Sequence, residues 1–227
     1  MVRKTFHQEM KEVKDEVLLL SSMVENAVME SVQALKDNDQ DRSRIVLKND
    51  LLVNRKRYEI EMFIMVLMAT QQPIARDLRT LAASLDVCTE LERMGDYAKG
   101  IAVINLRSEG LSMPDLLQEI YAMAEKAVDL LHRAMTSYAD EDLAAARLTI
   151  PGDDVLDASY ENLYSLAMQS VIDDPRNIDR ANYVIWVAHN LERLGDRATN
   201  ICERVFFIVT GERYQEVFKM QEFSSVE

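Results

Sequence analysis

The chain has 227 residues, of which 48% are hydrophobic, and its formal net charge is −13. This hydrophobic content excludes a disordered chain, and the length is sufficient for one large domain or two small ones with a sizeable core. The acidic balance argues against non-specific binding of nucleic acid and against an anionic membrane surface as a direct partner.

Six long helices and an all-α fold are predicted, because glycine and proline are scarce and apolar residues recur at spacings of three and four. Pro151 falls inside the fifth helix, where it removes a backbone hydrogen bond and clashes with the preceding turn. A kink or break is therefore expected there. The helices are expected at about residues 4–37, 42–69, 74–106, 114–138, 140–173 and 178–209.

The string LERMGD at residues 91–96 returns as LERLGD at residues 191–196, each time in the last helix of a three-helix unit. An offset of 100 residues is too long for a small solenoid repeat and fits duplication of a three-helix bundle. The predicted units are residues 1–110 and 111–211, followed by a C-terminal tail at 212–227.

Both strings are unfavourable for an isolated helix. Glu92 and Asp96 lie one turn apart on the same face, where like charges repel by a few tenths of a kcal/mol. Gly95 between them costs roughly 1 kcal/mol relative to alanine. The second string, with Glu192 and Asp196, repeats both penalties, which suggests that the residues serve a function.

The middle helix of each unit carries a second pair of oxygen-bearing side chains one turn apart. The first unit has Asp50 and Asn54, and the second has Asp153 and Asp157, at a similar offset of 103 residues. Carboxylates on facing helices can bridge several metal ions, and the cations would relieve the repulsion between the acids.

The second unit should hold the better furnished site. Asn200 lies one turn beyond Asp196 and extends the same stripe, whereas its counterpart Gly100 offers no ligand. All-oxygen ligands suit magnesium, manganese, calcium or ferric iron, and carboxylates also accept zinc.

Three other interpretations remain open. The acidic stripes can be solvated faces of a metal-free scaffold, with Arg93 and Arg193 as counter-ions. They can instead form a metal-dependent enzyme, although the only D-x-x-H pattern, at Asp129 to His132, stands alone and a di-iron site needs two such motifs. Arginines near the proline turns could hold phosphate or form salt bridges at helix ends: Arg76, Arg79, Arg176 and Arg180.

The remaining features concern location. Cys88 and Cys202 do not occupy equivalent positions in the two units and are expected to be small apolar core residues. The N-terminal residues lack the apolar segment of a signal peptide, and no apolar run approaches the length of a membrane span. A cytoplasmic location is therefore expected.

The two strings, in the contexts ELERMGDYAKGIA and NLERLGDRATNICERV, resemble the paired signature of the PhoU family of bacterial phosphate-uptake regulators. The resemblance covers nearly the whole chain and includes the turn QQPIARDLR and the two-unit layout. It implies two tandem antiparallel three-helix bundles and a protein that is not an enzyme.

The resemblance also implies a negative regulator of phosphate uptake and of the phosphate-starvation response. Its expected partners are the ATPase subunit of the phosphate ABC transporter, the phosphate sensor histidine kinase and a second copy of the chain. Multinuclear clusters of divalent or trivalent metal ions, such as Fe, Zn, Mn or Mg, are implied on the bundle surface. Carried over to this sequence, the candidate ligands are Asp50, Asn54, Glu92, Asp96, Asp153, Asp157, Glu192, Asp196 and Asn200.

Overall fold

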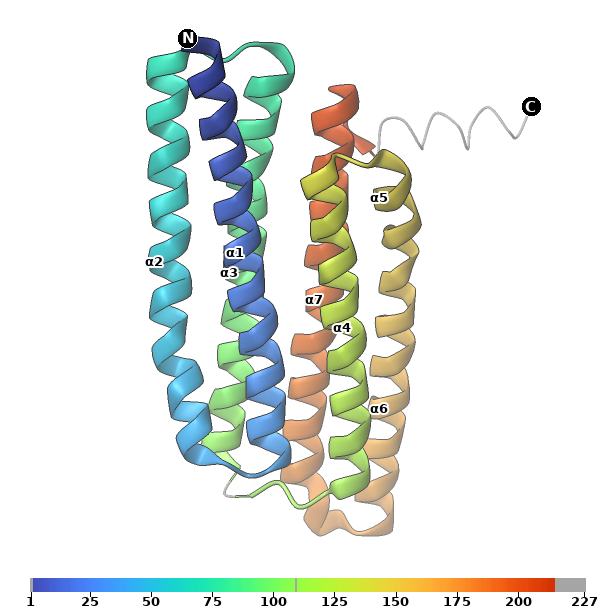
Figure 1. Ribbon diagram of the computed structural model, residues 1–227. Coiled ribbons are helices and arrows are strands. Elements are labelled where there is room, and N and C mark those ends of the chain that lie inside the picture. The colour runs from blue at the N-terminus through green and yellow to red at the C-terminus, as the bar shows by residue number, and fades with distance from the viewer. Residues whose placement is uncertain (1, 109, 215–227) are drawn as a thin grey trace, which may run out of the picture.

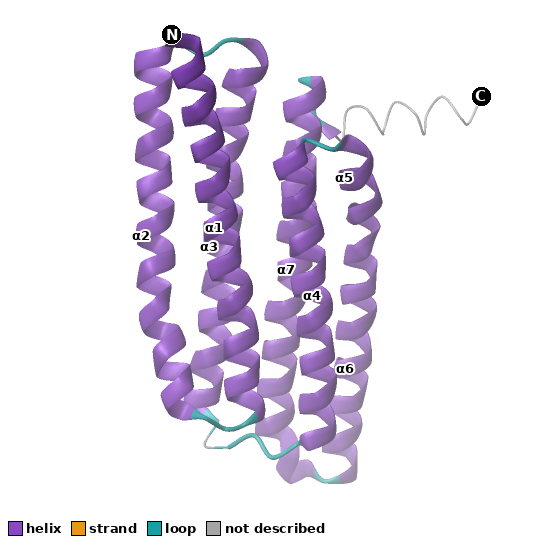
Figure 2. Ribbon diagram, in the orientation of Figure 1, coloured by secondary structure: helices purple, strands orange, loops and turns teal. Residues whose placement is uncertain are grey.

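The computed structural model describes residues 2–108 and 110–214, and every regular element in these ranges is a helix (Figures 1 and 2). The first three helices form one antiparallel bundle, and the following ones form a second bundle beside it (Figure 1). The all-α prediction of two tandem three-helix bundles is confirmed. The elements are α1 (Val2–Lys36), α2 (Gln40–Gln71), α3 (Ala75–Arg107), α4 (Pro114–Asp140), α5 (Leu143–Thr149), η1 (Ile150–Gly152), α6 (Asp153–Asp173), η2 (Pro175–Asn177) and α7 (Ile178–Thr210).

The helix ends follow local sequence signals. Asp39 caps α2, since its carboxylate accepts a hydrogen bond of 2.9 Å from the backbone N–H of Arg42. Gly211 ends α7 at a positive φ of 80°, a conformation that glycine adopts without strain. The break expected at Pro151 is confirmed, because the predicted fifth helix is divided into α5, the 3-10 turn η1 and α6. Most of the predicted tail, residues 215–227, lies outside the described residues.

The two bundles share one hydrophobic core. Helix α1 contacts α4 and α3 contacts α7, so these four helices form the centre while α2 and α6 lie at opposite edges (Figure 1). The fully buried hydroxyl of Tyr138 on α4 lies 2.6 Å from Ser84 Oγ on α3, which satisfies both polar groups within the shared core. Cys88 and Cys202 are buried and free, as expected. None of the described helices is long and apolar enough to cross a lipid bilayer.

Candidate metal centre

The second repeat brings four carboxylates together where α6 begins and meets the middle of α7. Asp153 and Asp157 lie one turn apart at the start of α6, and Glu192 and Asp196 lie one turn apart on α7. Burial raises the pKa of Asp153 to about 6, and the negative charges of the other three acids add to the shift. Burial and the charge of Asp196 likewise raise the pKa of Asp157. The geometry thus places these four predicted ligands close enough for their negative charges to act on one another.

Gly195 permits the close approach of the two helices. A Cβ atom at this position would overlap Asp153 Oδ1 and would lie 2.8 Å from Leu156 Cδ1, so the start of α6 packs directly on the backbone of α7. In the first repeat, a Cβ on Gly95 would meet Val53 Cγ1 at 3.3 Å, which is a tight but milder contact. The helical glycine therefore serves the approach of the neighbouring helix, most stringently in the second repeat.

Two oxygens of the second-repeat site lack hydrogen-bond partners within the described residues. They are Asp153 Oδ1 and Glu192 Oε2, both buried. His189 Nδ1 lies 3.0 Å from Glu192 Oε2, which makes an ion pair only when the imidazole is protonated. No Lys or Arg of the described chain forms an ion pair with Asp153, Asp157 or Glu192, and Arg197 is the ion-pair partner of Asp196, at 3.6 Å. A hydrogen bond to Tyr97 is the main cause that raises the pKa of Arg193, and the charges of Asp196 and Glu192 also contribute to it. Buried carboxylate oxygens without donors are costly, and a cation would satisfy them.

The first repeat neutralises its acids with its own cations. Lys99 Nζ lies 2.7 Å from Asp50 Oδ2 and 3.7 Å from Asp96 Oδ1. Asn54 Nδ2 donates to the same oxygen of Asp50 at 3.3 Å. The hydrogen bond from Lys99 to Asp50 is the main cause that raises the pKa of the lysine.

A second cation completes the neutralisation of the first repeat. Arg57 lies 3.3 Å from Glu92 Oε2 and 2.7 Å from Glu61 Oε1. Asp50, Glu92 and Asp96 of the first repeat are therefore each within ion-pair distance of a lysine or an arginine.

The two repeats differ in how well their side chains could bind a metal ion. In residues 2–108 and 110–214, no three His, Cys, Asp or Glu side chains as they stand are arranged to hold a metal ion. The second repeat nonetheless has donors of the right type: four acids, two buried carboxylate oxygens without a hydrogen bond, and a glycine that lets Asp153 approach α7 closely. The first repeat does not fit a metal ion, because Lys99 and Arg57 already supply the positive charge beside Asp50 and Glu92.

The ninth predicted ligand, Asn200, faces the interface between the repeats. Its Nδ2 donates to Glu90 Oε2 at 3.2 Å, and Arg197 Nη1 lies 3.2 Å from the same oxygen. The two arginines that the metal-free interpretation offers as counter-ions pair elsewhere. Arg93 lies 3.5 Å from Glu90, and Arg193 donates to the hydroxyl of Tyr97 at 3.3 Å. Neither arginine forms an ion pair with the repeated Glu and Asp residues in the described structure.

The comparisons with known proteins agree with this architecture. The PhoU domain model matches residues 17–104 and 120–205, one match in each repeat. The chain belongs to the PhoU family. A PhoU homolog of the phosphate-specific transport system from Clostridium acetobutylicum is 30% identical, and the match covers 94% of this chain and 98% of the relative. For a homolog from Synechocystis the identity is 32% and the coverages are 93% and 94%.

Solved PhoU structures share the fold. The crystal structure of PhoU from Pseudomonas aeruginosa matches with a TM-score of 0.84 and 29% identity, covering 91% of this chain and 100% of that one. PhoU from Streptococcus pneumoniae matches with a TM-score of 0.83 and 25% identity, covering 92% and 98%. The family resemblance inferred from the two strings is thus confirmed.

Arginines at the turns of this PhoU-family chain pair mainly within the protein. Arg76 forms an ion pair with Glu141, and Arg176 lies 2.7 Å from Asp174. Arg79 donates to the backbone carbonyl of Ile208 at 3.2 Å. These contacts favour the salt-bridge and capping interpretation of the turns over a phosphate site.

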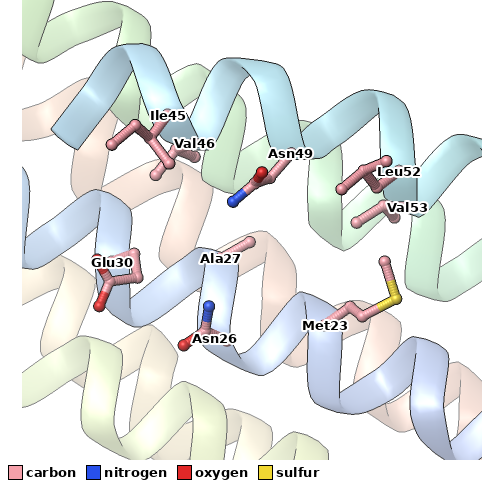
Figure 3. Close-up of a pocket in the computed structure, with 9 residues that line it drawn as sticks. All are labelled: Met23, Asn26, Ala27, Glu30, Ile45, Val46, Asn49, Leu52 and Val53. Carbon is pink, nitrogen blue, oxygen red and sulfur yellow. The ribbon is translucent and has the colours of Figure 1, made fainter. Parts of the chain in front are cut away.

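Helix α2 presents an exposed apolar face that the sequence reasoning did not identify. Leu51, Tyr58, Met62 and Met65 are spaced by seven, four and three residues and share its outer side, with Leu51 67% exposed. Beside this face, side chains of α1 and α2 line a groove of about 310 Å³ (Figure 3). None of the nine predicted ligands lines that groove. The signal in the sequence was the presence of apolar residues on two opposite sides of α2.

Proposed function

We propose that this PhoU-family chain is a metal-binding, non-catalytic regulator of phosphate uptake. In this proposal it represses uptake and the phosphate-starvation response as an adaptor between the ATPase subunit of the phosphate ABC transporter and the phosphate sensor histidine kinase. The names of relatives support the transport part, since those from Clostridium acetobutylicum and Escherichia coli are described as phosphate-specific transport system accessory proteins.

The observation that carries the metal part is the acidic site of the second repeat, in which Asp153 and Asp157 have no Lys or Arg ion-pair partner within the described residues. Asp153, Asp157, Glu192 and Asp196 would hold the metal ions, because their charges converge and two of their oxygens lack donors. Bound metal would supply positive charge that links α6 to α7 and stiffens this surface. No bond making or breaking is required of the protein residues, which is consistent with a regulatory role.

An adaptor needs surfaces for other proteins, and the exposed face of α2 is suited to this. A row of apolar side chains on an edge helix is typical of a protein–protein contact. We also propose that the chain forms a homodimer, as the family resemblance implies.

Two measurements test the function. Elemental analysis of protein purified without chelator should find transition-metal ions, and the variant Asp153→Asn/Asp196→Asn should lose them. A pull-down with the purified ATPase subunit and with the kinase should then retain the wild-type chain. Metal-free protein at all tested metal concentrations would refute the metal part, and absence of association with both partners would refute the adaptor part.

A further inference from the structure

The two repeats differ at the positions that hold cations in the first. At the offset of 100 residues that superposes the two strings, Lys99 corresponds to Thr199. At the offset of 103 residues that relates Asp50 to Asp153, Arg57 corresponds to Tyr160. Both lysine and arginine are therefore particular to the first repeat, although the acids around them recur in the second.

The replacements in the second repeat supply no positive charge. Thr199 Oγ1 is buried and has no hydrogen-bond partner within the described residues. The ring of Tyr160 packs against His189, with 6.1 Å between centroids. The second repeat also has Asp157 where the first has the neutral Asn54, which adds negative charge. Its own cation is Arg197, which stands where the first repeat has Tyr97 and lies 3.6 Å from Asp196 but pairs with neither Asp153 nor Asp157.

Lys99, whose side chain is 42% exposed, reaches a buried acid of the first repeat. The Asp50 side chain is only 6% exposed and receives donors from both Lys99 and Asn54. A metal ion entering this site would have to displace Lys99 from a buried carboxylate and leave two like charges close together. Charge-assisted hydrogen bonds with a buried partner are among the stronger interactions of a folded chain.

We propose that Lys99 and Arg57 are resident counter-ions that replace metal in the first repeat, so that the chain takes up metal at the second repeat alone. The part that concerns the second repeat rests on the proposed function. The part that concerns the first repeat is independent of it, because it depends only on contacts within the chain.

The experiment is a stoichiometry measurement on paired variants of the full chain. Wild type, Asp50→Asn/Asp96→Asn and Asp153→Asn/Asp196→Asn are each equilibrated with Mn²⁺ or Zn²⁺, desalted and analysed for metal. The first-repeat variant should keep the full wild-type stoichiometry, and the second-repeat variant should lose all of it. A loss of about half of the metal from each variant would overturn the proposal.

Exchange of the counter-ions provides the second arm. Lys99→Thr combined with Arg57→Tyr should create a new metal-binding event, whereas Thr199→Lys should abolish the existing one and raise the melting temperature in EDTA. Lys99→Arg keeps the charge and should behave as wild type. Unchanged metal content in both exchanges would contradict the proposal.

The two proposals fail in different ways. If the wild type binds no metal, the proposed function is lost, but Lys99→Thr should still lower the melting temperature in EDTA while Lys99→Arg does not. Equal melting temperatures for wild type, Lys99→Thr and Lys99→Arg would overturn the role of Lys99 as a counter-ion.

Discussion

Replacing Asp153 by asparagine should stabilise the metal-free protein. In the folded chain, burial and neighbouring charges raise the pKa of this carboxyl to about 6, compared with an ordinary value of 3.8. A shift of about two units corresponds to roughly 3 kcal/mol of destabilisation of the charged form, as an upper bound. Asp153 is partly exposed, and the N-terminus of α6 stabilises its negative charge. Replacement by asparagine should therefore raise the free energy of unfolding by only about 1 kcal/mol.

The pH dependence follows from the sign of the shift. Because the folded state holds the proton of Asp153 to a higher pH than the unfolded state, this carboxyl lowers stability progressively as pH rises from about 4 to 6. The advantage of Asp153→Asn should therefore be complete at pH 7 and disappear near pH 4. A gain of about 1 kcal/mol corresponds to a rise in melting temperature of about 2–4 °C for a chain of this size.

The assay is thermal unfolding in EDTA and then in Mn²⁺, with Asp50→Asn as the matched control. Asp50→Asn should lower the melting temperature, because Lys99 loses a partner at 2.7 Å that is buried. In excess Mn²⁺, wild type should melt at a higher temperature than Asp153→Asn, which is the reverse of the order in EDTA. A ligand at about 100 times its Kd adds roughly 2.7 kcal/mol to the free energy of unfolding of wild type, and the variant should not gain it. A lower melting temperature for Asp153→Asn in EDTA at pH 7 would refute the electrostatic reasoning.

Three further predictions concern packing, the repeat interface and partner contact. Gly195→Ala should destabilise by about 1–3 kcal/mol because its Cβ overlaps the adjacent helix, whereas Gly95→Ala should change stability by less than about 1 kcal/mol in chemical denaturation. Glu90→Ala should cost about 1–3 kcal/mol in the same assay, since it removes the acceptor shared by two half-buried donors of α7, Arg197 and Asn200. Met62→Glu should weaken binding of the ATPase subunit at least tenfold in a titration, while Leu148→Glu on exposed α5 should not; equal binding would exclude the α2 face.

Sequence reasoning succeeded where periodicity and local chemistry decide the structure. The helices, the break at Pro151 and the duplication follow from spacing, from the missing N–H of proline and from repeated letters. The convergence of Asp153 with Glu192 was also predictable, because each pair occupies one face of its helix and the two helices are neighbours.

The partners of the acids were not predictable in the same way. Lys99 lies one turn beyond the repeated string, and its choice of Asp50 on another helix depends on how α2 and α3 are rotated against each other. The metal-free interpretation offers Arg93 as a counter-ion because it is close to the acids in sequence, yet the rotation of α3 directs it toward Glu90. Side-chain pairing between helices depends on rotations of tens of degrees, which sequence periodicity does not determine.

The acidic centre and the interface between the repeats are joined through one side chain. Arg197 lies 3.6 Å from Asp196, a candidate ligand, and 3.2 Å from Glu90 on α3, and its side chain is only 16% exposed. Positive charge bound at Asp196 would repel this guanidinium and weaken its attraction to that acid, while the contact with Glu90 would remain. The effect of Glu90→Ala should therefore be larger in Mn²⁺ than in EDTA, and a double-mutant cycle with Asp196→Asn isolates the coupling. Equal effects in both conditions would mean that metal at the second repeat and the packing of the two bundles are energetically independent.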